Sequence, residues 1–135
     1  MHESVTYAEA CPACSARLKC VGTQFLLAGS LEWGIEYHCS GCGYCEAECG
    51  RADISTDLRQ RLLEVHGPSR LVLNAPMGQA AAAMKVLRAE TGGTLAEAKS
   101  RLDQIRRGLY VGTMPEIAYL AERLTASGVA ASAAR

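Results

Sequence analysis

The N-terminal third of the chain carries two cysteine pairs, each with the spacing C-x2-C. Two residues between a pair of thiolates allow one tight turn to direct both sulfurs at the same ion, and two such turns complete the tetrahedral thiolate site that zinc prefers. Pro12 stiffens the first turn, and Gly43 follows the second, where a residue that tolerates positive φ is needed. The sequence therefore predicts one structural Zn²⁺, with the ligands Cys11, Cys14, Cys39 and Cys42.

The other three cysteines leave a second metal assignment open. All seven cysteines lie in the first 50 residues, and an odd number leaves one unpaired under any disulfide scheme. The last four have the C-x2-C-x2-C-x3-C spacing of bacterial iron–sulfur ferredoxins, which makes an iron–sulfur cluster the alternative cofactor. Gly50 replaces the proline of that run, and the first pair would lack partners. We expect Cys45 and Cys49 to be free thiols or alternative ligands, and Cys20 to be a small buried residue.

The segment between the two pairs has the pattern of a β-hairpin. Residues 18–27 are mostly β-compatible, residues 28–30 read as a turn, and apolar and polar residues alternate over 33–38. With a C-x2-C pair at each end, residues 10–50 resemble the zinc ribbon family. That resemblance implies two metal-binding knuckles that cap a hairpin.

A short amphipathic helix is predicted directly after the ribbon. Ser55-Thr56-Asp57 is a helix start, Leu58, Leu62 and Val65 recur at helical spacing, and Gly67-Pro68 ends the run. We expect this helix to pack the ribbon onto a second domain, and the alternative is a helix that binds a partner.

The C-terminal half predicts a short strand at 71–73, a loop at 74–78 and three helices. The first helix covers 79–90 and ends at Gly92-Gly93. The other two each begin with a capping box, Thr94 with Glu97 and Thr113 with Glu116. A terminal edge strand is expected at 129–133. The expected apolar helix faces are Leu95, Ala98, Leu102 and Ile105, then Ile117, Leu120 and Leu124.

Together these patterns predict an α+β fold in three parts. Residues 1–52 form the zinc ribbon, residues 53–69 a linking helix, and residues 70–135 a compact α/β domain. That last domain is expected to place about three helices on a small antiparallel sheet.

Residues 71–134 resemble the C-terminal domain of the bacterial ribosomal stalk protein. The resemblance rests on three runs: residues 84–88 (MKVLR), Thr91-Gly92, and residues 95–99 (LAEAK). It implies a docking module for translational GTPases, which uses the exposed face of the first two helices. The chain departs from the family at Ala80, where the family has a lysine, and the ribbon replaces the family's dimerisation region. The implied contact residues are Met84, Lys85, Arg88 and Lys99.

The composition gives little reason to expect a membrane or nucleic-acid partner. The chain has 14 Lys and Arg residues and 14 Asp and Glu residues, so it has no net charge that would attract it to nucleic acid or to an anionic membrane. No apolar run approaches the roughly 20 residues of a membrane span. The first ten residues lack the basic start and apolar run of a signal peptide, so we expect a cytoplasmic protein.

We predict a non-enzymatic adaptor or regulatory protein that binds a protein partner, with a translation factor and another regulatory protein as the candidates. No phosphate loop, zinc-protease helix or nucleophile elbow is present in the sequence. One alternative is nucleic-acid binding by the ribbon, through Arg17, Lys19 and Arg51 near an exposed aromatic surface. Four glutamates in the same unit count against it. The aromatic residues of that surface are Trp33, Tyr37 and Tyr44, and the glutamates are Glu32, Glu36, Glu46 and Glu48.

The further alternative is an iron–sulfur or thiol redox role.

Overall fold

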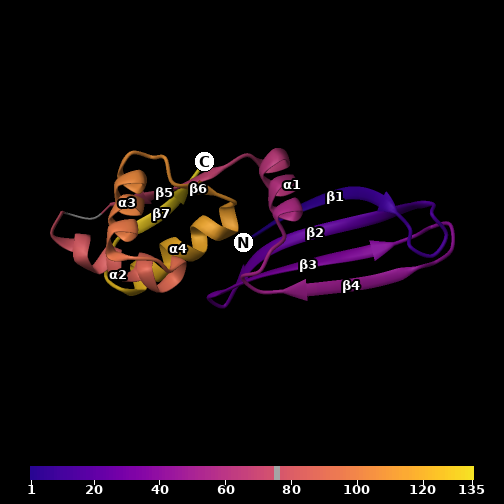
Figure 1. Cartoon of the computed structure of the whole chain (residues 1–135), viewed down its shortest axis with the longest axis horizontal. Helices are drawn as coiled ribbons and strands as arrows, with labels where there is room; N and C mark the ends of the chain where they lie inside the picture. Colours follow the sequence, from indigo (N-terminus) through magenta and orange to yellow (C-terminus); the bar gives the residue numbers. More distant parts are fainter. Residues whose placement is uncertain (75–76) are drawn as a thin grey trace. The chain divides into compact units, whose positions relative to one another are not determined.

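The structure, a computed structural model, describes residues 1–74 and 77–135 and divides the chain into two compact units. The first unit is Met1–His66 and the second is Gly67–Arg135. Each has its own antiparallel sheet and helical structure (Figure 1), and each has its own buried core. The predicted α+β class is therefore confirmed, while residues 75–76 of the predicted loop lie outside the described part.

The first unit contains a four-stranded sheet in the order β1-β2-β3-β4. The predicted hairpin is present as β2 and β3, and its turn places Ala28 and Gly29 at φ of 50° and 77°. Two consecutive positive φ values are what a two-residue hairpin turn requires. The sheet has two strands beyond the predicted hairpin, one before the first knuckle and one after the second, and both pair with the hairpin. The strands are β1 His2–Ala10, β2 Arg17–Leu27, β3 Ser30–His38 and β4 Cys45–Gly50.

Helix α1 (Thr56–His66) covers one face of this sheet (Figure 1). Ser55 caps it, since its hydroxyl accepts a hydrogen bond from the Leu58 amide at 3.1 Å. Leu58 and Leu62 are fully buried with the sheet residues of that face. The helix expected to link two domains thus belongs to the first unit. Val65 was expected on its apolar face but is 61% exposed, so that assignment was wrong.

Gly22 of β2 lies beneath α1, and because it has no side chain the helix can pack closely against the sheet. A Cβ atom there would overlap Leu58 Cδ1. We expect Gly22→Ala to lower the free energy of unfolding of this unit by about 1–3 kcal/mol, because Leu58 must leave its packed position. A urea titration followed by Trp33 fluorescence measures this.

The matched control for Gly22 is Gly34 on the neighbouring strand β3. A Cβ at Gly34 would be in ordinary contact with the Glu48 carbonyl oxygen, at 3.6 Å. We expect Gly34→Ala to change stability by less than about 0.5 kcal/mol. Equal losses from the two substitutions would contradict this account of the α1 packing.

The second unit is built around β5 (Ser69–Leu73), with β6 (Val111–Gly112) on one side and β7 (Ala131–Ala134) on the other. The two-residue strand β6 was not predicted. The terminal strand begins later than expected because the Val129 amide bonds to the Leu124 carbonyl at the end of the preceding helix, at 2.9 Å, while the Val129 side chain is buried in the core. The 3-10 turn η1 and helices α2, α3 and α4 cover Met77–Gln79, Ala80–Thr91, Leu95–Arg106 and Met114–Ala126.

Both predicted capping boxes are confirmed. Thr94 and Thr113 each accept a hydrogen bond from the backbone amide three residues later, and the glutamate at that position accepts one from the backbone amide of the cap residue. The buried helix faces also agree with the prediction, with one exception. Leu95 is 57% exposed, because it occupies the first turn of α3, before that helix reaches the core.

Candidate metal centre

Two short turns, each carrying one C-x2-C pair, lie at the same end of the first unit's sheet. One turn connects β1 to β2 and the other connects β3 to β4. The flanking residues are cross-strand partners, Ala10 with Arg17 and His38 with Cys45. Since β2 pairs with β3, the antiparallel order brings both turns to the same end of the sheet.

The two turns repeat the same backbone geometry. The Ser15 amide donates to the Cys11 carbonyl at 2.8 Å, and the Gly43 amide donates to the Cys39 carbonyl at 2.9 Å. Ser15 and Gly43 occupy equivalent positions, with φ of 63° and 79°. The positive φ expected of Gly43 is confirmed. Ser15 adopts the same conformation with a side chain present, at a cost of about 1–2 kcal/mol.

The turns bring the sulfurs of all four proposed ligands together. The four Sγ atoms lie within 4.8 Å of one another. Two of the distances are 3.7 Å, between Cys11 and Cys42, and 3.6 Å, between Cys14 and Cys39. A tetrahedral Zn²⁺ with Zn–S bonds of about 2.3 Å separates its sulfurs by about 3.8 Å. The cluster is therefore of the size that could hold such an ion.

The ionisation of the cluster also favours a bound cation. The backbone amides of Cys42 and Gly41 lower the pKa of Cys39 to about 7, so this thiol readily becomes a thiolate. The Ala16 amide favours the Cys14 thiolate, but the sulfurs of Cys42 and Cys39 outweigh it and raise the pKa of Cys14 to about 12. Four adjacent thiolates repel one another, and a divalent cation between them removes that penalty.

The remaining cysteines lie outside this cluster. Cys20 is fully buried, as predicted for a small apolar residue. Cys45 and Cys49 are exposed free thiols on β4. Four residues of extended strand separate them by about 13 Å. The ferredoxin-like spacing therefore does not gather one set of ligands in this structure.

The implied partner-binding residues lie on α2 and α3 of the second unit. Lys85 and Arg88 are exposed on α2 and Lys99 on α3, while Met84 is partly buried against the core. Lys85 also borders a hollow of about 420 Å³ between α2 and α4. Neither Arg88 nor Lys99 lines this hollow.

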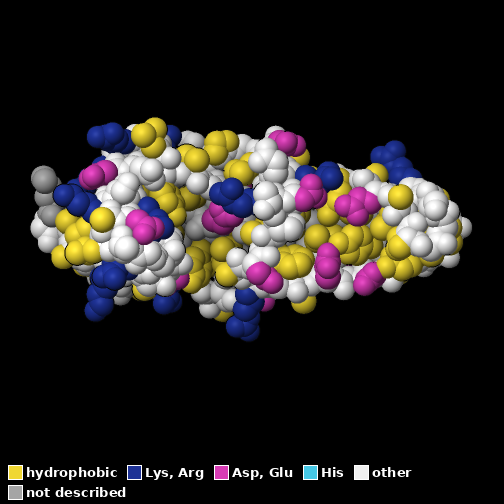
Figure 2. Space-filling model, viewed as in Figure 1, with side chains coloured by type: hydrophobic (Ala, Val, Ile, Leu, Met, Phe, Trp, Pro, Cys, Tyr) yellow, Lys and Arg dark blue, Asp and Glu magenta, His cyan; other side chains and the backbone are white. Residues whose placement is uncertain are grey.

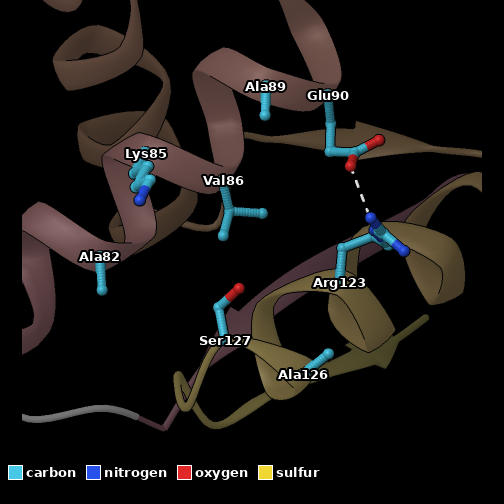
Figure 3. A pocket seen from close by; sticks show the side chains of 8 residues that line it. All are labelled: Ala82, Lys85, Val86, Ala89, Glu90, Arg123, Ala126 and Ser127. Atoms are coloured by element: carbon cyan, nitrogen blue, oxygen red, sulfur yellow. Dashed lines mark hydrogen bonds and ion pairs between the residues drawn. The ribbon is translucent and has the colours of Figure 1, made fainter.

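Figure 3 shows the hollow between α2 and α4, with Lys85 on one side and Arg123 on the other. Arg123 Nε donates to Glu90 at 3.1 Å, and Glu90 also accepts a hydrogen bond from the Tyr119 hydroxyl at 2.6 Å. No sequence pattern pointed to Arg123, since only tertiary packing brings α4 beside α2. The apolar lining residues are Ala82, Val86, Ala89 and Ala126.

The expected aromatic and basic surface of the ribbon does not form one face. Trp33 and Tyr37 lie on the α1 side of the sheet, whereas Arg17 and Lys19 alternate to the other side. The aromatic polar groups bond to acids: Trp33 Nε1 donates to Asp53 at 2.9 Å, and Tyr37 donates to Glu48. Burial and the Glu48 contact raise the pKa of Tyr37. Figure 2 shows acidic side chains among apolar ones over the strands of the first unit.

Within the described residues, none of the helices is both long and apolar enough to cross a bilayer. Comparison of the chain with known protein families, with curated proteins and with solved structures found no match in any of the three.

Proposed function

We propose that this chain is a non-enzymatic binding protein whose first unit is held together by one structural Zn²⁺. The observation that carries the proposal is the four-sulfur cluster. Four thiolates fill every position of a tetrahedral ion and leave none for a substrate or an activated water. Cys11 and Cys39 are 2% and 0% exposed, so a bound ion is shielded on that side. The metal then serves folding rather than catalysis.

The second unit supplies the proposed contact surface for a protein partner. Lys85, Arg88 and Lys99 are exposed, and in the described part of the chain none of them has an ion-pair partner. Lys85 stands beside the hollow with the apolar lining. This combination suits an acidic segment that places one small apolar side chain in the hollow and its carboxylates on the surrounding cations. The resemblance to the ribosomal stalk domain makes a translational GTPase the first partner to test.

The test is affinity capture with the full chain and with the double variant Lys85→Glu/Arg88→Glu. We expect the variant to weaken binding at least tenfold, because two attractive contacts become repulsive. Binding is measured by pull-down from cells that produce the protein, and then by titration with a purified translational GTPase.

The control for the partner test is the double variant Arg51→Glu/Arg107→Glu. It changes the net charge by the same amount, at two exposed arginines outside α2. Capture that is unchanged by Lys85→Glu/Arg88→Glu, or equally weakened by the control, would remove this surface from the proposal. Zinc content, measured in parallel, shows whether the first unit remains intact in each variant.

A further inference from the structure

A second groove, of about 360 Å³, lies on the first unit at the end of the sheet near the metal centre. Arg17, Lys19 and His38 supply nitrogen groups to it, and Thr6 and Ser40 supply hydroxyls. It takes no residue from the second unit, so it is separate from the protein-binding surface proposed above.

The sheet register explains why these groups meet. Arg17 and Lys19 are alternate residues of β2, so they project from the same side of the sheet about 6.6 Å apart. His38 is the cross-strand partner of Lys19 on β3. Thr6 is on β1, and Ser40 is in the turn that follows β3. Three adjacent strands and one knuckle therefore build this groove on the face opposite α1.

The groove is positively charged although the chain has no net charge. Arg17 and Lys19 have no ion-pair partner among residues 1–74 and 77–135, and none of the residues lining the groove is acidic. Other arginines of the chain are paired, as Arg61 is with Asp57 and Arg101 with Glu97.

The acids near this end of the sheet lie mostly on the other side. Glu9, Glu46 and Glu48 line a separate hollow with Tyr37 and Tyr44. Glu36 does share the face of the groove, but it stands opposite Val21 and does not line it. The fold thus separates the charges of the ribbon into a basic side and an acidic, aromatic side. Two like charges held together without a partner are unfavourable in the free protein, and an anion removes that penalty.

We propose that this groove binds the phosphates of a nucleic-acid backbone. An arginine fork, a lysine and neighbouring hydroxyls are the groups that contact phosphate in such complexes. Two cations spaced along an open strand suit successive phosphates of a polymer.

The groove contacts the backbone rather than the bases. Tyr7 contributes to the lining, but its ring is covered by the Arg61 guanidinium at 4.1 Å and is not free to stack on a base. Binding is therefore independent of base sequence and sensitive to salt.

The experiment is fluorescence anisotropy with the zinc-loaded full chain and two labelled probes, a single-stranded RNA and a DNA duplex of mixed sequence. At low salt we expect binding of at least one probe. Neutralising two phosphates predicts a slope of about −2 in a plot of log affinity against log salt concentration. The variant Arg17→Glu/Lys19→Glu is expected to lose at least about tenfold in affinity and most of the salt slope.

The variant Arg106→Glu/Arg107→Glu serves as the control, because it makes the same charge change at two exposed arginines outside the groove. It should retain most of the affinity of the unaltered chain. The proposal is overturned if neither probe binds at low salt, or if the control loses as much affinity as the groove variant. Tighter binding of a phosphorylated peptide than of either oligonucleotide would also overturn it. One zinc per chain in each variant establishes that the sheet is intact.

Discussion

Loss of the metal is expected to unfold the first unit and to leave the helices of the second unit in place. The buried cluster of the first unit is small and includes Cys11 and Cys39, which are themselves proposed ligands. Structural zinc contributes about 10–16 kcal/mol in zinc-finger peptides, which is as large as the whole stability of a small domain. The second unit has its own sheet and core, so it does not depend on this ion.

Either a chelator or the substitution Cys39→Ser should produce this result. Trp33, the single tryptophan of the chain, lies in the first unit, where its indole donates to Asp53. Its fluorescence is expected to shift to that of a solvent-exposed indole. Far-UV circular dichroism should retain most of its helical signal, because α2, α3 and α4 all belong to the second unit.

Cys45 and Cys49 provide the matched controls for the ligand assignment. Both are exposed on β4 and lie outside the sulfur cluster, so Cys45→Ser and Cys49→Ser should retain one zinc per chain. Loss of zinc from either control variant would indicate that the substituted cysteine of β4 is a metal ligand. Elemental analysis of the purified protein identifies the ion, and a coloured protein that contains iron would contradict the zinc assignment.

The second large effect is expected from Leu124 in α4. Its side chain is fully buried in the core of the second unit. Leu124→Ala should lower the free energy of unfolding of this unit by about 2–5 kcal/mol, through lost apolar burial and the cavity that remains. For a unit of this size, such a loss lowers the melting temperature by about 10 °C or more.

Leu95 is the control for Leu124, since it is also a helical leucine of the second unit but is 57% exposed. Leu95→Ala should change stability by less than about 0.5 kcal/mol. Thermal unfolding followed by far-UV circular dichroism measures both variants, and Trp33 fluorescence monitors the first unit separately. Comparable losses from the two substitutions would contradict the burial pattern described for α3 and α4.

The features that were predictable from the sequence depend on short stretches of chain. Helices α3 and α4 begin close to their predicted positions because each start is determined within four residues. Thr94 with Glu97 and Thr113 with Glu116 form their capping boxes irrespective of distant contacts. The conformation of the hairpin turn at Ala28 and Gly29 is likewise determined by residues that are adjacent in the chain.

Other features could not be predicted, because they depend on pairing between distant residues. Strand β4 contains Glu46 and Glu48 on the side that faces α1, so it lacks the apolar alternation that identifies a half-buried strand. It is extended because it pairs with β3 after the second knuckle. The same pairing carries Cys45 and Cys49 away from the metal centre, which spacing alone could not reveal.

The cysteine pairs illustrate both kinds of information. The sequence by itself determined the four candidate ligands and the two knuckle turns, because each turn is closed by hydrogen bonds within six residues of chain. Only the tertiary structure decided that the two turns meet at one end of a four-stranded sheet. It also decided that Arg17 and Lys19 face away from Trp33 and Tyr37. Side-chain direction in a sheet follows the register, and the register is set by contacts between strands that are far apart in the chain.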